Sequence, residues 1–295
     1  MSAPKLGLLA ALVIANVAFV LAWWRDARRR SVRPAPLASD IAIGFGTDFL
    51  DALGIGSFAP TTALFKFRGS PADELIPGTL NVGHNAAAFV ETVVFVTAVA
   101  VEPALLATMV ASATIGAWLG AGIVSGLPRR AIQLFMGFAL LLAATFFVMG
   151  IFGWFPGGGV AMALTGWRFG LAVGVNFVLG ALMSVGIGPY APSMVLLALL
   201  GLHPLAAFPI MMGTCGIVQP VASLRFFKTG RFDFGASVGL TIGGTVGVLI
   251  AIFIVRQLPL LALRWLVIVV VAYAAFTMLR SAWRSRQDAI ATPAT

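Results

Sequence analysis

Long apolar stretches recur along this chain, and short segments rich in charge, glycine or proline separate them. Each stretch is close to the ~20 residues that an α-helix needs to cross the hydrocarbon core of a bilayer. The pattern therefore predicts an all-α polytopic membrane protein. Continuous spans are expected at residues 6–24, 80–101, 103–125, 130–152, 205–225, 235–256 and 260–280.

Two other apolar segments, residues 41–67 and 169–200, contain the same interruption. Gly54-Ile55-Gly56-Ser57-Phe58-Ala59-Pro60-Thr61 in the first is matched by Gly186-Ile187-Gly188-Pro189-Tyr190-Ala191-Pro192-Ser193 in the second, 132 positions later. Glycine adopts backbone angles that other residues avoid, and proline is well suited to the first turn of a helix. Each segment is therefore predicted to be a helix, a short unwound turn and a second helix.

An unwound turn inside a bilayer needs protein or a water-filled cavity to satisfy its amides, so a buried and repeated turn indicates a binding site. The alternative is that the glycines only kink helices or let them pack closely. A packing motif needs small residues at helical spacing. The proline six positions after the first glycine in both copies argues against it.

The two interruptions belong to a longer repeat. Aligned without gaps, residues 45–77 and 177–209 share ten identities. We expect two homologous repeats, each with a broken or re-entrant helix and three transmembrane helices, after one extra N-terminal transmembrane helix. The expected divisions are an N-terminal anchor with a basic linker at 1–40, the first repeat at 41–153, a connecting loop at 154–168, the second repeat at 169–282 and a cytoplasmic tail at 283–295.

The anchor ends in Trp23-Trp24, and a cluster of arginines follows from Arg25 to Arg33. This order predicts an N-terminus outside the cell. A cleaved signal peptide would carry its positive charge first and end in small residues, so we expect the anchor to be retained.

Lysine and arginine positions test the path of the interrupted segments, because these residues concentrate in cytoplasmic loops. If each segment crosses once, 12 of the 19 lie on the cytoplasmic side. If each returns to its own side, Lys66, Arg68, Arg129 and Arg130 join that side, Arg168 leaves it, and the number becomes 15. The second path gives three full crossings per repeat and so inverts the second repeat. Four crossings per repeat, in parallel orientation, stay open as the alternative.

Composition excludes several classes of protein. With 60% hydrophobic and 10% charged residues, and a mean hydropathy of +1.02, the chain has too little polar surface for a soluble globule. The net charge of +9 does not indicate nucleic acid binding, because much of it lies beside apolar segments. Cys215 is the single cysteine, and the two histidines lack CxxC or HExxH spacing. No metal site or cofactor is therefore expected.

Each copy of the Gly-x-Gly-x-x-x-Pro element is followed by a small and polar patch, Gly78-Thr79 to Asn81 in the first repeat and Gly213-Thr214-Cys215 in the second. Thr-Ile-Gly and Leu-Pro then recur near the later segments. In these features residues 41–282 resemble the sulfite and organosulfonate exporter family (TauE/SafE) of membrane permeases. The chain departs from that family where Ser57-Phe58 and Pro189-Tyr190 replace glycines that many members have, which leaves the substrate open.

The resemblance implies transport of a small sulfur-containing anion, such as sulfite, a sulfonate or sulfoacetate, driven by an ion gradient. It also implies a multi-pass protein of the bacterial cytoplasmic (inner) membrane. The expected partners are the anion, a coupling proton or sodium ion and the lipid bilayer. Homo-oligomerisation stays open.

Backbone amides near Gly56 to Thr61 and near Gly188 to Ser193 are expected to donate to an oxyanion, helped by the positive end of each second half-helix. For Phe58 and Tyr190 the alternative is a core or gate role, and for Asn81 and Thr214 it is hydrogen bonding between helices. The candidate substrate-binding residues are Gly54, Gly56, Ser57, Phe58, Thr61, Asn81, Gly186, Gly188, Tyr190, Ser193 and Thr214.

Four ionisable residues of the first repeat are candidates for coupling. Asp48 and Asp51 share one face of the helix before the first turn, and His84 and Glu91 share one face of the next segment. Charged groups in hydrocarbon are costly and are usually functional or paired, and these four are typical of a proton or ion relay. The alternatives are that an aspartate neutralises Lys66 or an arginine, and that His84 is a satisfied interior histidine.

The sequence therefore favours a secondary transporter, and not an enzyme, with a small anion bound between two broken helices at mid-membrane. One alternative is a membrane-embedded enzyme that uses Asp48, Asp51, His84 and Glu91 on a lipid-borne substrate, although no nucleophile or metal spacing accompanies them. The other alternative is a passive anion channel.

Overall fold

The computed structural model describes residues 3–30, 35–154, 159–186, 188–253 and 260–291. Within these ranges the chain is almost entirely helical, which confirms the predicted all-α class, and its one strand-like pairing is a bridge between Ala161 and Leu202. The elements are α1 (Ala3–Arg30), α2 (Ala38–Ala52), α3 (Phe58–Arg68), the short 3-10 helix η1 (Asp73–Leu75), α4 (Ile76–Gly83), α5 (Asn85–Ala98), α6 (Pro103–Val124), α7 (Arg129–Ile151), α8 (Gly166–Met183), α9 (Tyr190–Leu199), α10 (Pro204–Thr229), α11 (Phe234–Phe253) and α12 (Leu260–Ala291).

Six of the described helices are long and apolar enough to cross a membrane: α1, α6, α7, α8, α10 and α11. Large apolar side chains remain on their outer faces, and Ile14 of α1, for example, is 69% exposed. Lipid is the solvent that such surfaces fit. The chain is therefore a multi-pass membrane protein, as the sequence predicts.

The helix bounds differ from the expected segments at three places. The expected continuous span at 80–101 consists of α4 and α5, which meet at His84. The interruption is only local, because the His84 amide donates to the Leu80 carbonyl at 3.1 Å. Helix α8 begins at Gly166, inside the expected connecting loop, and α12 continues to Ala291, where a tail was expected, because alanine, arginine and glutamine favour the helix there.

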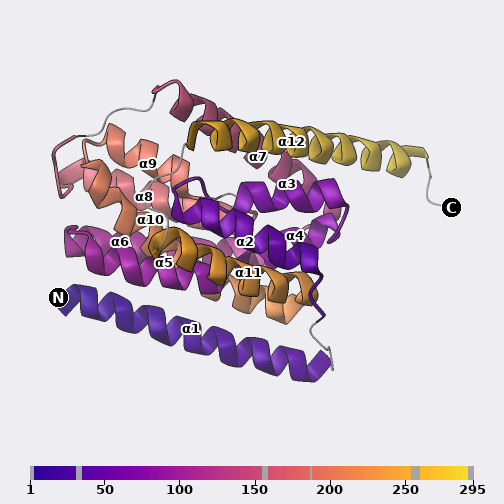
Figure 1. Cartoon of the computed structure of the whole chain (residues 1–295), viewed down its shortest axis with the longest axis horizontal. Helices are drawn as coiled ribbons and strands as arrows, with labels where there is room; N and C mark the ends of the chain where they lie inside the picture. The colour runs from indigo at the N-terminus through magenta and orange to yellow at the C-terminus, as the bar shows by residue number, and fades with distance from the viewer. Residues whose placement is uncertain (1–2, 31–34, 155–158, 187, 254–259, 292–295) are drawn as a thin grey trace.

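The helices α2 and α3 run antiparallel and form a hairpin. Arg68 at the end of α3 forms an ion pair with Asp40 at the start of α2 and donates to Ser39 at 2.8 Å. Closer to the turn, the Thr61 hydroxyl donates to Thr47 Oγ1 at 2.9 Å. The segment therefore returns to the end of the molecule at which it began, as Figure 1 shows.

The helices α8 and α9 form a second hairpin in the same way. Arg168 near the start of α8 donates from Nη1 to the carbonyl of Leu200, just beyond the end of α9, at 3.4 Å. The two hairpins begin at opposite ends of the molecule, since the start of α2 lies near the end of α1 and the start of α8 lies near the opposite end (Figure 1).

Each hairpin packs its first helix against a glycine-containing helix of the other half of the chain. Helix α2 lies along α11, where Gly243 leaves no room for a side chain beside the Ile41 carbonyl. Helix α8 lies along α6, where Gly116 approaches the Phe177 carbonyl in the same manner. Small residues at such positions allow helix backbones to approach closely in lipid.

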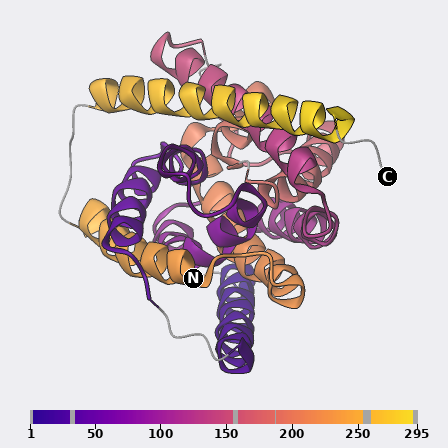
Figure 2. The same ribbon diagram turned by 90° about the vertical axis from the view of Figure 1, so that its right-hand side faces the viewer.

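Two further helix pairs run antiparallel, since Phe95 of α5 stacks on Phe208 of α10, and Phe152, just after α7, contacts Trp265 of α12. In the α4–α5 segment, the Thr92 hydroxyl donates to the Met212 carbonyl of α10 at 2.6 Å. Helix α7 lies against α12, where Gly137 contacts the Leu279 side chain. Figures 1 and 2 show α12 along one edge of the bundle and α1 along the opposite edge.

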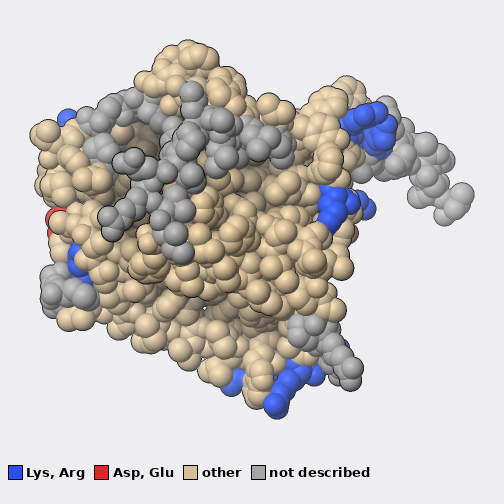
Figure 3. Space-filling model, in the orientation of Figure 1, with Lys and Arg blue, Asp and Glu red and all other residues tan. Residues whose placement is uncertain are grey.

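Positive charge gathers at one end of the molecule (Figure 3). Among the described lysine and arginine side chains, Lys5 and Arg168 lie at the other end, where they contact the Val99 and Leu200 carbonyls. The remainder lie at the end where α1 and α12 finish: Arg25, Arg28, Arg29, Arg30, Lys66, Arg68, Arg129, Arg130, Arg225, Lys228, Arg231, Arg280 and Arg284.

Candidate functional site

The first turn joins α2 to α3, with Ile55 and Ser57 buried and Gly54 exposed. Gly54 and Gly56 have φ angles of 83° and 88°, which side chains disfavour, so these positions suit glycine. The Gly54 amide donates to the Asp51 carbonyl at 2.8 Å, and the Thr61 amide donates to the Ser57 carbonyl at 3.0 Å. The chain therefore closes one helix, turns, and opens the next within a few residues.

The second turn has the same backbone hydrogen bonds, 132 positions later. The Gly186 amide donates to the Met183 carbonyl at 3.0 Å, and the Ser193 amide donates to the Pro189 carbonyl at 2.9 Å. Gly186 also has a positive φ, 103°. Ile187 and the side chain of Tyr190 lie outside the described residues.

The two turns are neighbours in the protein interior. A Cβ built on Gly188 would lie 3.9 Å from the Cβ of Phe58. A Cβ on Gly186 would lie 3.3 Å from Leu80 Cδ1 and 3.2 Å from Met136 Cε. Sequence segments separated by more than a hundred residues therefore meet at this point, between α4 and α7.

Four consecutive amides of the first turn are free. Among the residues that the structure describes, no acceptor is found for the N–H groups of Gly56, Ser57, Phe58 and Ala59. Pro60 follows and has no N–H. Ser57 and Phe58 are only 2% and 3% exposed, so water does not reach these groups freely. Free amides at the start of a helix carry partial positive charge and suit an anionic ligand.

The predicted role of Thr61 as a ligand donor needs correction. Its amide is used by the Ser57 carbonyl and its hydroxyl by Thr47, which in turn donates to the Ile43 carbonyl at 2.8 Å. Thr61 therefore holds the hairpin together. Thr47 was not singled out from the sequence, although it lies four positions before Asp51 and so shares its helix face.

An acidic cluster lies directly beside the free amides. Asp48 Oδ1 is 2.7 Å from His84 Nδ1, and both side chains are at most 1% exposed. The Ser57 hydroxyl donates to Asp51 Oδ2 at 2.6 Å. The His84 ring lies against the Phe58 ring, with centroids 5.6 Å apart. Three of the four predicted coupling residues therefore meet at the first turn.

Glu91, the fourth, is also buried, at 1% exposed, and lies further along α5. The four predicted coupling residues, three acids and one histidine, are therefore all buried, and three of them lie together at the first turn.

The second turn has apolar surroundings instead. Met183 stands where the first repeat has Asp51, and it is fully buried with Met136, Met211 and Met212. Among the described residues, the carboxylates and the imidazole of the site therefore lie at the first turn, whereas the second turn contributes the buried hydroxyl of Ser193.

The other predicted substrate residues lie in hydrogen bonds between or within helices. Asn81 donates to the Pro77 carbonyl of its own helix at 2.8 Å. Thr214 accepts from Asn176 Nδ2 at 3.4 Å, and Asn176 also donates to the Met109 carbonyl at 2.8 Å. Ser193 is buried at 2% exposed. Asn176 was missed from the sequence, although it is a rare polar side chain within an apolar stretch.

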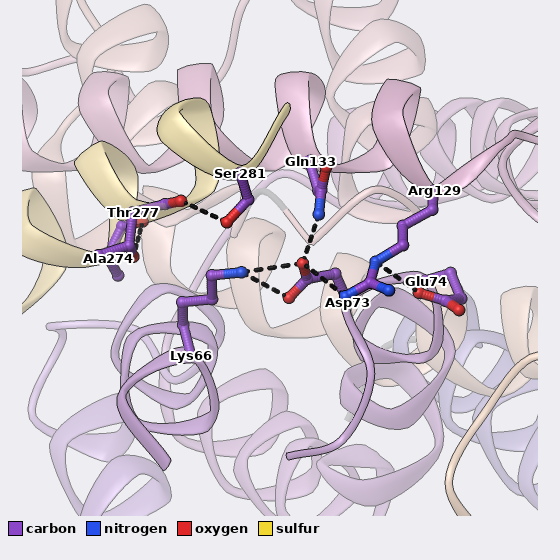
Figure 4. A network of polar contacts seen from close by, with 8 residues as sticks. All are labelled: Lys66, Asp73, Glu74, Arg129, Gln133, Ala274, Thr277 and Ser281. Atoms are coloured by element: carbon purple, nitrogen blue, oxygen red, sulfur yellow. Dashed lines mark hydrogen bonds and ion pairs between the residues drawn. The ribbon is translucent and has the colours of Figure 1, made fainter. Parts of the chain in front are cut away.

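A separate ion-pair network lies at the cation-rich end (Figure 4). Lys66 of α3 donates to both Asp73 carboxylate oxygens, at 2.9 and 2.8 Å, and Gln133 of α7 donates to the same carboxylate at 2.6 Å. Arg129 reaches Glu74 at 3.4 Å. The alternative interpretation in which Asp48 or Asp51 neutralises Lys66 is therefore wrong, since Asp73 does so.

Comparison of the chain with protein-family models, with curated proteins and with solved structures finds no match.

Proposed function

We propose that this protein is a secondary transporter that binds a small anion between the two turns at mid-membrane. The single observation that carries the proposal is the row of free amides at Gly56 to Ala59, in which Ser57 and Phe58 are buried and Phe58 adjoins Gly188 of the second turn. Broken helices that meet at the bilayer centre, with helix N-termini toward an anionic group, are the arrangement on which many secondary transporters rely.

The proposal includes an inverted repeat. In support, α2 packs on α11 as α8 packs on α6, and these pairs correspond under the 132-residue match of the sequence. The corresponding segments α4–α5 and α10 run antiparallel, as do α7 and α12. A twofold axis in the membrane plane relates elements in this way.

The orientation follows from charge. The cation-rich end is proposed to face the cytoplasm, since lysine and arginine concentrate there in membrane proteins. Lys66, Arg68, Arg129 and Arg130 belong to this end, which agrees with the re-entrant path. The N-terminus of α1 then faces the other side, and a bacterial inner membrane is the proposed location.

The substrate class rests on the free amides and on the resemblance to the TauE/SafE permeases. Amides that donate in a row suit an oxyanion, and a sulfite, sulfonate or sulfoacetate group offers several acceptor oxygens. The coupling ion is proposed to bind at the acidic cluster of Asp48, Asp51 and His84, because ionisable groups in a membrane interior are usually placed there for function.

Transport by the purified full-length protein in proteoliposomes tests the proposal. We expect uptake of at least one of sulfite, methanesulfonate, sulfoacetate and thiosulfate when a proton or sodium gradient is imposed. Flux that persists equally without any gradient would identify a passive channel. The absence of flux for all four anions, under both gradients and in both orientations, would contradict the proposal.

A further inference from the structure

The Asp48–His84 pair adjoins the free amides of the first turn. The His84 ring lies against Phe58, which opens α3, and Ser57 of the same turn donates to Asp51, three residues after Asp48. The second ring nitrogen, His84 Nε2, is buried and has no hydrogen-bond partner among the described residues. The unpaired imidazole nitrogen therefore belongs to a ring that contacts the side chain of Phe58, one of the residues whose amide is free.

The protonation state of His84 decides what that nitrogen offers. When the ring is neutral and Nδ1–H donates to Asp48, Nε2 presents a lone pair, which repels an anion. When the ring takes up a proton, Nε2–H becomes a donor and Asp48 stabilises the resulting imidazolium. Protonation therefore adds one more donor to the row of amides.

The surrounding charges favour this proton. Asp51 lies three residues after Asp48 on α2 and accepts from Ser57, and Glu91 is buried further along α5. The described length of α11, which packs Gly244 against Asp48, contains no titratable residue. No described lysine or arginine forms an ion pair with Asp48, since Lys66 and Arg68 are engaged at the far end of α3. An anion would otherwise enter beside carboxylates without a compensating positive charge.

We infer that the anion binds together with one proton, which the Asp48–His84 pair holds. This inference rests on the proposed function and names its coupling ion. The proton and the anion then move in the same direction, and a monovalent anion crosses without net transfer of charge. A pH difference, and not the membrane potential, drives the net movement of such an anion.

Proton uptake during binding tests the inference on the unmodified full-length protein. Methanesulfonate, isethionate and thiosulfate serve as probes, because their charge does not change between pH 5.5 and 7.5. Calorimetric titration in two buffers of different ionisation enthalpy gives the number of protons taken up. We expect about one proton per anion, and a dissociation constant that rises about tenfold per pH unit above the range in which the free pair is protonated.

Two variants and one control place the proton. His84→Gln and Asp48→Asn should each remove the proton uptake and flatten the pH dependence of binding. His203→Gln, which changes the other histidine at the start of α10, should leave both unchanged.

The outcomes separate the inference from the proposed function. Binding of a probe with no proton uptake and with equal affinity at both pH values would overturn the inference and leave the proposed function intact. If no probe binds at any pH, the proposed function fails and the inference fails with it. Unaltered proton uptake in folded His84→Gln and Asp48→Asn proteins would also overturn the inference.

Discussion

The Cβ that Gly188 lacks would lie 3.9 Å from the Cβ of Phe58. This single contact joins the turn of one hairpin to the turn of the other, although the hairpins begin at opposite ends of the molecule. Whatever binds to the amides of the first turn therefore lies next to the second turn as well.

Gly188→Leu should abolish anion transport, because the new side chain would extend toward Phe58 and occupy the space between the turns. Phe58→Ala in the same chain should restore part of the lost flux, since it removes the ring that the leucine meets. Flux in proteoliposomes measures both effects. Gly170→Leu is the matched control, because Gly170 is an exposed helical glycine with nothing within 4 Å. An equal loss of flux in the Gly188→Leu and Gly170→Leu proteins would contradict the predicted contact.

Gly54→Ala and Gly56→Ala should each destabilise the protein by about 1 kcal/mol or more, because both residues have positive φ. Neither position has a neighbouring atom within 4 Å, so the cost comes from the backbone alone. Gly46→Ala, within α2 and equally open, should instead stabilise by roughly 0.5–1 kcal/mol. Equilibrium unfolding in detergent measures the change in unfolding free energy for each variant. A change of the same sign in all three would contradict the strained backbone at Gly54 and Gly56.

Gly116→Ala should destabilise by about 1–3 kcal/mol, because its methyl group would meet the Phe177 carbonyl and force α6 away from α8. Gly122→Ala on the same helix meets only the Arg225 side chain, at 3.8 Å, and should be tolerated. The difference in melting temperature between the two variants is the measurement. A Gly116→Ala protein as stable as the control would show that the helices do not approach closely.

Asp73→Ala should cost about 3–5 kcal/mol, because it leaves Lys66 buried without its carboxylate. The side chains of Lys66 and Asp73 are only 14% and 6% exposed. Asp26→Ala removes the more exposed pair with Arg30 and should cost about 0–1 kcal/mol. Equilibrium unfolding of both variants compares the two losses of stability, and equal losses would contradict the prediction. Adding Lys66→Met to the Asp73→Ala protein should recover part of its lost stability.

Cysteines at Ser39 and Ser70, introduced one at a time with Cys215→Ala, should react with an impermeant reagent from the same side of the membrane. Both positions are exposed at the cation-rich end, in the first turn of α2 and after the end of α3. A cysteine at Thr165, before α8, should react from the opposite side. Labelling of residues 39 and 70 from different sides would show that the segment crosses the bilayer.

Glycine spacing and charge were the informative parts of the sequence. The turns fall at Gly54 and Gly186, because only positive φ at those positions explains the repeated glycine, and this preference is local. The positions of Lys66 and Arg68 indicated the re-entrant path, since charge at a membrane surface depends on topology and not on packing.

Side-chain contacts between different helices could not be predicted in the same way. The sequence placed Asp48 and His84 among the coupling candidates, but their direct contact depends on how α2 and the α4–α5 segment pack. Lys66 has several carboxylates within reach along the chain, and only the fold selects Asp73. Helix ends such as that of α12 depend on weak propensities and are the least certain part of any sequence pattern.

The contrast between the acidic first turn and the methionine side chains beside the second turn makes the two turns unequal. Hydrating the first turn solvates carboxylates and an imidazole, whereas water beside the second turn would meet the apolar side chains of Met136 and Met183 and the hydroxyl of Ser193. A carrier with equivalent halves would have no preferred resting state. Here we expect the empty molecule to rest with the ionisable turn open to water.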